Sequence, residues 1–304
     1  MFCGYGGNNP WSTFNVPSNA KDLSLAEANV SEGSIGFYQF ANPALLTKTN
    51  NLDFGLCYNM MALDRSTQVV SVNFNLPPKA GIGLSAMRSG TSKIQGKDSF
   101  NNNTYEIDVY DMLGMISFGV SIHKYASIGI NIKASYSNLD NIFENIDAPS
   151  YSLFSKGIGV DFGGAINLSN FFMGLKIENI KTSNNWNLNL GDEGNSYEQN
   201  VPVIYKIGTH YKASKTLMMY LENDIIHNSS YLLKYSISYN INNYGFQCGF
   251  SHDFKKKSKF MLPVFGFYYS GHLWGKQLFD LNYGINLGNV DEGISHIFTW
   301  TIIK

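Results

Sequence analysis

Charged residues are scarce in this sequence, and long apolar runs are absent from it. Asp, Glu, Lys and Arg make up 15% of the 304 residues, and the formal net charge is −1. Nucleic-acid binding requires clustered Lys and Arg, so we expect no nucleic-acid partner. No apolar run approaches the roughly 20 residues that a membrane-spanning helix requires. If this chain crosses a membrane, we therefore expect it to do so as a closed β-sheet.

Cysteines are also few, and they do not indicate a disulfide. Cys57 falls on the polar phase of one predicted strand and Cys248 on the apolar phase of another, so their side chains should point to opposite faces. The first ten residues have neither the basic region nor the apolar core of a secretory signal, and no lipoprotein-type signal precedes Cys3. We therefore expect the sequence to represent a mature or trimmed chain.

The motifs of familiar enzymes are missing as well. The sequence has no Gly-x-Ser-x-Gly elbow, no Gly-x-x-x-x-Gly-Lys phosphate loop and no His-Glu-x-x-His zinc motif, and its six histidines lie far apart. We predict that the protein is not an enzyme and that it holds neither a metal nor another cofactor.

What the sequence does contain is a strict alternation of apolar and polar residues, in about fourteen short segments from Leu52 to the C-terminus. In one of these segments Tyr205, Ile207 and Tyr211 share one phase, while Lys206 and His210 take the other. Successive side chains of a strand point to opposite faces, whereas a helix would give a period near 3.6. The alternation predicts β-strands with one apolar and one polar face.

Two kinds of β-protein fit this pattern, a soluble sandwich and a membrane barrel. The polar phase consists mostly of Gly, Ser and Asn with scattered charges, which suits a crowded lumen better than a surface facing bulk water. The apolar phase is rich in aromatic residues, which form girdles at both membrane interfaces of outer-membrane barrels. Short and long connections also alternate; the long ones are expected at 94–104, 140–150, 181–201, 255–259 and 286–293. We predict an all-β fold, a transmembrane antiparallel β-barrel of about 14 strands formed by residues 51–304, with the long loops at its outer end.

Residues 1–50 lack this alternation, and here a family resemblance becomes visible. The stretch Pro17–Leu25 and the motif Asn42-Pro43-Ala44 resemble the amino-terminal signature of the PorV/PorQ family, which is related to FadL-type outer-membrane transporters. Weaker similarities lie at 51–55, 127–133, 159–164 and 281–285. The sequence departs from the family at Ala26-Glu27-Ala28, where Gly-Gly-Ala is usual. The resemblance implies that residues 1–50 form a plug, or hatch, inside the barrel.

The resemblance also implies a function. PorV/PorQ proteins are outer-membrane components of the type IX secretion system, so the expected partners are outer-membrane lipid and secretion-system proteins or cargo sorting domains. The alternative is a FadL-like channel for hydrophobic small molecules, and a purely structural role is a third interpretation. For Asn42 and Pro43, one interpretation is a kinked gate. The other is a turn that leads the chain into the first strand, because proline removes a backbone donor and disfavours helix at the preceding residue.

Two further sets of residues are candidates for the functional site. Polar residues on the lumen-facing phase are expected to pair across strands around a wet lumen, rather than to act as acid and base groups; they are Lys133, Asp161, Lys206, His210, Lys212, Glu222, Asp224 and Lys234. The expected loop at 181–201 mixes aromatic and acidic residues, and it is either a solvated loop or a partner-binding surface; its candidates are Trp186, Asp192, Glu193 and Tyr197.

Overall fold

The computed structural model describes residues 11–97, 101, 103–139, 152–190, 193–226, 230–254, 263–273, 277–288 and 293–304. Four short helices precede the strands: η1 (Ser12–Phe14), α1 (Ala20–Ser24), α2 (Tyr38–Ala41) and η2 (Pro43–Lys48). The strands are β1 (Leu52–Met60), β2 (Arg65–Leu76), β3 (Ala80–Lys97), β4 (Asn103–His123), β5 (Ala126–Leu139), β6 (Ser152–Leu168), β7 (Phe171–Leu190), β8 (Glu193–Glu198), β9 (Ile204–Lys212), β10 (Leu217–Ile226), β11 (Ser230–Ile241), β12 (Tyr244–Asp253), β13 (Val264–Leu273), β14 (Gln277–Asn286) and β15 (Ser295–Ile303).

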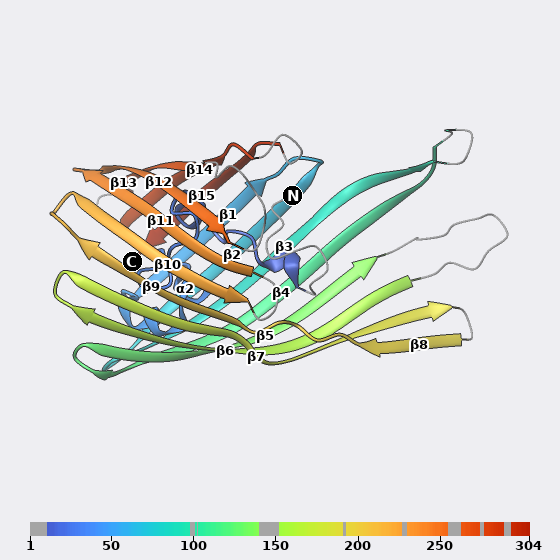
Figure 1. Cartoon of the computed structure of the whole chain (residues 1–304), viewed down its shortest axis with the longest axis horizontal. Coiled ribbons are helices and arrows are strands. Elements are labelled where there is room, and N and C mark those ends of the chain that lie inside the picture. Colours follow the sequence, from blue (N-terminus) through green and yellow to red (C-terminus); the bar gives the residue numbers. More distant parts are fainter. Residues whose placement is uncertain are drawn as a thin grey trace.

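The strands form one closed antiparallel sheet (Figure 1). Each strand pairs with its neighbour in the chain, except that β7 pairs with both β8 and β9. The first strand pairs with the last, from Asp53 opposite Ile303 to Met60 opposite His296, which closes the barrel. Fourteen strands complete the circuit, because β8 pairs with β7 alone. The prediction of an all-β barrel of about 14 strands is confirmed.

The apolar phase of the strands faces outward. In β9 the side chains of Tyr205 and Ile207 are exposed, while His210 is 1% exposed and faces inward. The same outward phase continues around the barrel, as at Ile132 and Ile158. A continuous exposed apolar surface of this kind is unfavourable in water and suits contact with lipid. The barrel is therefore a transmembrane one, with the polar phase directed into its lumen.

The described part of the chain contains no helix that combines the length and the apolar character needed to cross a membrane.

Strands on one side of the barrel are much longer than those on the other. From β3 to β7 they have 14 to 21 residues, whereas β9 to β15 have 9 to 12. About 9–11 residues span a bilayer as a tilted strand, so the long strands extend several residues beyond it. Figure 1 shows this extension, which ends at the β7–β8 hairpin.

This extension corrects two of the expected loops. The segment expected as a loop at 181–201 is mostly strand, since β7 runs to Leu190 and β8 follows from Glu193 to Glu198. The expected loop at 94–104 is shortened in the same way by β3 and β4. Both segments are rich in Asn, Ser, Thr and Lys, and the apolar residues of β7 alternate with Asn only from Trp186 to Leu190, which is too short a run to mark a lipid-facing strand. The expected loops at 140–150 and 255–259, and residues 289–292 of the one at 286–293, lie outside the described residues.

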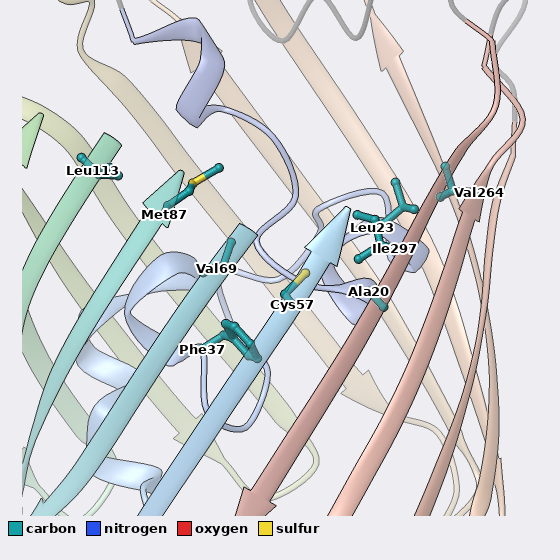
Figure 2. Close-up of a cluster of buried hydrophobic side chains, with 9 residues drawn as sticks. All are labelled: Ala20, Leu23, Phe37, Cys57, Val69, Met87, Leu113, Val264 and Ile297. Atoms are coloured by element: carbon teal, nitrogen blue, oxygen red, sulfur yellow. The ribbon is translucent and has the colours of Figure 1, made fainter. Parts of the chain in front are cut away.

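Residues 11–50, called the N-terminal segment below, lie inside the barrel. Its helix α1 contacts β12 to β15, and η2 contacts β2 to β6. One apolar cluster joins the segment to the wall (Figure 2); its buried members are Ala20, Leu23, Phe37, Cys57, Val69, Met87, Leu113, Val264 and Ile297. Phe37 is fully buried, so the interior is filled by the segment rather than by wall side chains alone.

Glycines on the inner phase of the strands make room for this segment. A Cβ added at Gly129 would lie 2.4 Å from the carbonyl carbon of Pro43, and one at Gly174 would lie 2.1 Å from the carbonyl oxygen of Val30. At Gly159 it would lie 2.8 Å from the indole of Trp11. Glycine within a strand is typical of close backbone approach. The glycine-rich polar phase is therefore a surface shaped to receive the chain.

Candidate functional site

Asn42 is fully buried, and its side chain joins the N-terminal segment to the barrel wall. Its Oδ1 accepts from the backbone N–H of Ala44 at 3.0 Å and so caps η2. Its Nδ2 donates to the carbonyl oxygens of Val30 (3.0 Å), Gly164 (2.9 Å) and Leu175 (3.2 Å). Gly164 and Leu175 face each other across β6 and β7, so one amide contacts two strands of the wall.

Pro43 and Ala44 continue this attachment. Asn42 has an extended backbone with φ −163°, as expected before proline, and Pro43 occupies the first position of η2, where no N–H is needed. The carbonyl of Pro43 lies against Gly119 and Gly129 on β4 and β5, and Ala44 is fully buried. The motif is therefore a wall contact as well as a turn.

Glu222, Asp224 and Lys234, predicted lumen residues, meet in one ionic cluster on β10 and β11. Lys234 Nζ lies 2.7 Å from Asp224 Oδ2 and 3.4 Å from Glu222 Oε1. The cluster also reaches the N-terminal segment: Glu222 Oε2 accepts from the N–H of Val30 at 2.8 Å, and Lys234 donates to the carbonyl of Glu27 at 3.2 Å. These charges pair across strands, and they also hold backbone groups of the segment.

Lys133 and Asp161 form a second cluster beside a register break between β6 and β7. Lys133 Nζ lies 2.6 Å from Asp161 Oδ1. The break leaves Asp161 opposite an irregular stretch of β7 in which Asn179 has φ +60°. Asp161 Oδ1 accepts the N–H of Asn179 at 2.9 Å, and Lys133 donates to Asn179 Oδ1 at 2.6 Å. The ion pair therefore provides hydrogen-bond partners for the backbone N–H and the side-chain oxygen of Asn179, at a point where the regular pairing of β6 and β7 is interrupted.

Lys206 belongs to a third cluster, with two residues that the sequence analysis did not single out. Glu178 Oε1 lies 3.0 Å from Lys206 Nζ and 2.8 Å from Lys176 Nζ. Lys176 also donates to the carbonyl of Phe40 at 2.6 Å. Lys176 and Glu178 alternate with Leu175 and Ile177, so the same phase rule that selected Lys206 was available for them.

His210 and Lys212 differ in their surroundings. His210 is buried, its ring is stacked on Phe172 at 4.1 Å between centroids, and its Nδ1 lies 3.0 Å from Ser31 Oγ. Lys212 is exposed at the end of β9, with its Nζ 4.8 Å from the centre of the Phe172 ring. His210 therefore contacts the N-terminal segment, and Lys212 lies at the barrel end.

An ion pair within the N-terminal segment is partly buried against the wall. Lys21 Nζ lies 3.2 Å from Glu32 Oε1, and Tyr220 donates a short hydrogen bond to Glu32 Oε2. Burial by itself would raise the pKa of Glu32, but the nearby Lys21 and His210, with the Tyr220 hydrogen bond, lower this pKa to about 2. Glu32 is thus held as a carboxylate.

At least three cavities lie between the described part of the segment and the wall, one of them, of about 150 Å³, beside Thr47 and Lys48 at the end of η2. The first, called the Trp11 cavity, has a volume of about 80 Å³. Its apolar lining includes Trp11, Phe14 and Leu113, and its charged lining includes Lys133 and Glu178. The second, about 200 Å³, borders Lys21 and is lined mainly by hydroxyl and amide groups of β11 to β15. The second cavity also has apolar residues such as Phe37 and charged ones such as Glu32, so both cavities combine the two kinds of group. The Trp11 cavity differs in that three aromatic rings of the segment, those of Trp11, Phe14 and Phe40, line it.

The predicted partner-binding residues are only partly described. Asp192 lies outside the described residues, and Glu193 begins β8 without a described side chain. Trp186 and Tyr197 face each other in the β7–β8 pairing, with ring centroids 6.5 Å apart. Among the described residues, no group of three or more His, Cys, Asp or Glu side chains is arranged to hold a metal ion.

Comparison with known proteins identifies a fold but not a family. No family model and no curated protein matches the sequence. Among solved structures, the toluene transporter TodX of P. putida matches with a TM-score of 0.68 and 10% identity over 95% of this chain and 98% of that one. A FadL homologue of Pseudomonas aeruginosa matches with a TM-score of 0.61 and 11% identity over 94% and 98%. The chain shares the fold of these proteins over nearly its whole length.

Proposed function

We propose that this protein is a channel of the bacterial outer membrane that admits small hydrophobic molecules, with the N-terminal segment as its plug. The observation that carries the proposal is the Trp11 cavity, which places Trp11, Phe14, Phe40, Leu113 and Met115 at the boundary between segment and wall. The shared fold supports it, because TodX is a toluene transporter and covers nearly the same length. The cavity also has seven charged lining residues, and five of them are paired with one another: Lys133 with Asp161, and Lys176 and Lys206 with Glu178. Pairing reduces the cost of placing an uncharged molecule beside them.

Passage past the segment requires the segment to move. Pro43 to Leu46 of η2 are buried against the wall, so we infer that a molecule in the Trp11 cavity is blocked in the present arrangement. Besides the apolar clusters, the segment is held by hydrogen bonds: Asn42 donates to wall carbonyls, Lys176 and Lys234 donate to carbonyls of the segment, and Glu222 accepts from Val30 N–H. Each such bond contributes about 0.5–3 kcal/mol net, and water can replace it when the segment shifts. A local shift of the segment is therefore the proposed gating step, with Asn42 as its contact to β6 and β7.

Filling the cavity tests this proposal. Leu113 faces the cavity, whereas its neighbour Met112 on β4 is 43% exposed on the outer face. Leu113→Trp should slow the uptake of toluene into proteoliposomes several-fold, while Met112→Trp should leave the rate unchanged. Both variants add a similar side-chain volume to the same strand. A difference between their uptake rates therefore reports the filling of the cavity and not a general disturbance of the barrel. Equal rates for the two variants, or no uptake by the unmodified protein above empty liposomes, would refute the proposal.

A role in type IX secretion, which the sequence resemblance implies, is a second candidate. The observation that favours it is the β7–β8 hairpin, which extends beyond the bilayer-spanning length and exposes 56% of Tyr197. The comparisons lend it no support. Deletion of residues 181–201 should then abolish copurification with secretion proteins or cargo sorting domains. If no such protein copurifies with the intact chain, the secretion role fails.

A further inference from the structure

Two aromatic rings lie side by side on the β7–β8 hairpin. Trp186 and Tyr197 are direct partners in the strand register, and their rings are almost parallel, with centroids 6.5 Å apart and an interplanar angle of 12°. Trp186 is half-buried and Tyr197 is 56% exposed. Such rings provide a large apolar contact surface, and on a polar hairpin this surface has no membrane to cover it.

The register shows that both rings are on the lumen-facing side of the hairpin. Trp186 pairs on its other side with Ser155 of β6, which is fully buried. Ser155 shares its phase with Gly157 and Gly159, and these two glycines are the ones that contact the indole of Trp11. The Trp186–Tyr197 pair is therefore on the same face of the sheet as the Trp11 cavity, nearer the tip of the hairpin.

Hydrogen bonds link the pair to that cavity. Trp186 Nε1 donates to Gln199 Oε1 at 2.7 Å, and the N–H of Gln199 donates to the carbonyl of Asn184 at 2.8 Å. Trp11 Nε1 donates to Asn184 Oδ1 at 3.4 Å. Both indole N–H groups are thus bonded to amides, which orients the rings. Trp11 is buried, with Lys133 Nζ 5.4 Å from its ring centre, whereas the half-buried Trp186 keeps part of its ring surface accessible. Asn184 thus contacts Trp11 directly through its side chain and Trp186 indirectly through Gln199.

We propose that Trp186 and Tyr197 form a capture site for a planar, uncharged aromatic molecule, which then passes along the β7–β8 face to the Trp11 cavity. The proposal rests on the proposed function and specifies its substrate class. Flat rings bind flat rings through stacking or edge-to-face geometry, which an alkyl chain or a saturated ring cannot reproduce. The side chains that bond the two indoles are uncharged amides, so a neutral ligand leaves no charge unpaired there.

Naphthalene and its saturated analogue decalin test the site. Binding is measured by saturation-transfer NMR with the full chain in nanodiscs, and the signal of empty nanodiscs is subtracted. Trp186→Leu should weaken the apparent Kd for naphthalene about three- to tenfold, because ring stacking contributes on this scale, and should leave decalin unchanged. Trp186→Phe should retain most of the affinity. The matched control is Trp300→Leu, which removes the same ring from the lipid-facing side of β15, where Trp300 is 38% exposed.

Each outcome decides the proposal. It is overturned if Trp186→Leu behaves like Trp300→Leu, or if decalin and naphthalene weaken equally. It is also overturned if Trp186→Leu leaves naphthalene binding unchanged but removes a copurifying protein, which would make the pair a protein-binding surface. The channel function is read separately from uptake into proteoliposomes. Naphthalene binding that depends on Trp186, without any uptake, would support the capture site and refute the channel. Uptake that is insensitive to Trp186→Leu would support the channel and refute the capture site.

Discussion

Two adjacent glycines of β6 provide a matched test of how tightly the N-terminal segment fits the wall. A Cβ added at Gly163 would lie 2.1 Å from Asn42 Oδ1 and 2.8 Å from Pro43 Cδ, whereas one at Gly164 meets nothing within 4 Å. Gly163 faces inward and Gly164 faces lipid. The substitutions Gly163→Ala and Gly164→Ala therefore add the same methyl group to opposite faces of one strand.

The expected magnitude follows from the contact. Real Cβ atoms are essentially never found closer than 3.0 Å to another heavy atom. The Cβ at Gly163 would be about 0.9 Å closer to Asn42 Oδ1 than this limit, so Asn42 or the strand must shift. Overpacking of this kind costs about 1–3 kcal/mol. If Asn42 yields instead, its four hydrogen bonds are weakened, at about 1 kcal/mol each. We expect Gly163→Ala to lower the unfolding free energy by about 2–3 kcal/mol. Gly164→Ala should be neutral or should stabilise by up to about 1 kcal/mol, because alanine restricts the unfolded chain.

Two measurements compare the Gly163→Ala and Gly164→Ala variants. Urea unfolding of the protein in lipid vesicles gives the free-energy difference between the variants. Conductance in planar bilayers reports whether a displaced Asn42 opens a path, and only Gly163→Ala should raise it. Equal stability and equal conductance for the two variants would refute the close fit of Asn42 to the wall. A loss of stability without a change in conductance would keep the fit and remove Asn42 from the gating step.

Other contacts and the membrane assignment lead to further predictions. Glu222→Leu removes the oxygens that lie against Val30 N–H and Lys234 and leaves both buried donors without this partner, so urea unfolding should show a loss of about 1–3 kcal/mol; an unchanged midpoint would contradict this. The pKa of Glu32 is lowered to about 2, so the stability from its pair with Lys21 is present above pH 4.5 and is lost as the pH falls through about 2. Unfolding midpoints in acid should therefore fall in the intact chain and level off in Glu32→Gln. The folded barrel should need detergent and should change its gel mobility on heating; a chain that is soluble and monomeric without detergent would refute the membrane fold.

The barrel was predictable because its alternation has a physical cause. Each strand must present apolar side chains to lipid and small or polar ones to the lumen, so the sequence records the face of every residue. This rule placed Ile207 outside and His210 inside. The rule fails where strands extend beyond the bilayer, because water can contact both faces of the sheet there. For that reason the extension of β7 to Leu190 was mistaken for a loop.

The contacts inside the barrel were less predictable. The phase rule shows that Glu222 faces the lumen, but it cannot show that Glu222 accepts from Val30, 192 residues away. The same holds for Lys206, whose partner Glu178 comes from β7 rather than from β10. A segment without alternation carries no information about its own path. The glycines of the strands are the sequence feature that points to these contacts. Glycines within a strand, such as Gly157 and Gly159, are typical of a site where another part of the chain approaches closely.

The long side of the barrel gathers the features that a channel entrance needs. Strands β3 to β7 extend beyond the bilayer, the register break between β6 and β7 lies among them, and the Trp11 cavity opens against the same strands. Extra strand length has no role in closing a barrel, because β9 to β15 do so with 9 to 12 residues. The extension provides a surface outside the lipid that is continuous with the lumen wall. If the proposed capture site operates, a hydrophobic molecule bound at Trp186 and Tyr197 would move along this surface to the Trp11 cavity, which lies against the same strands.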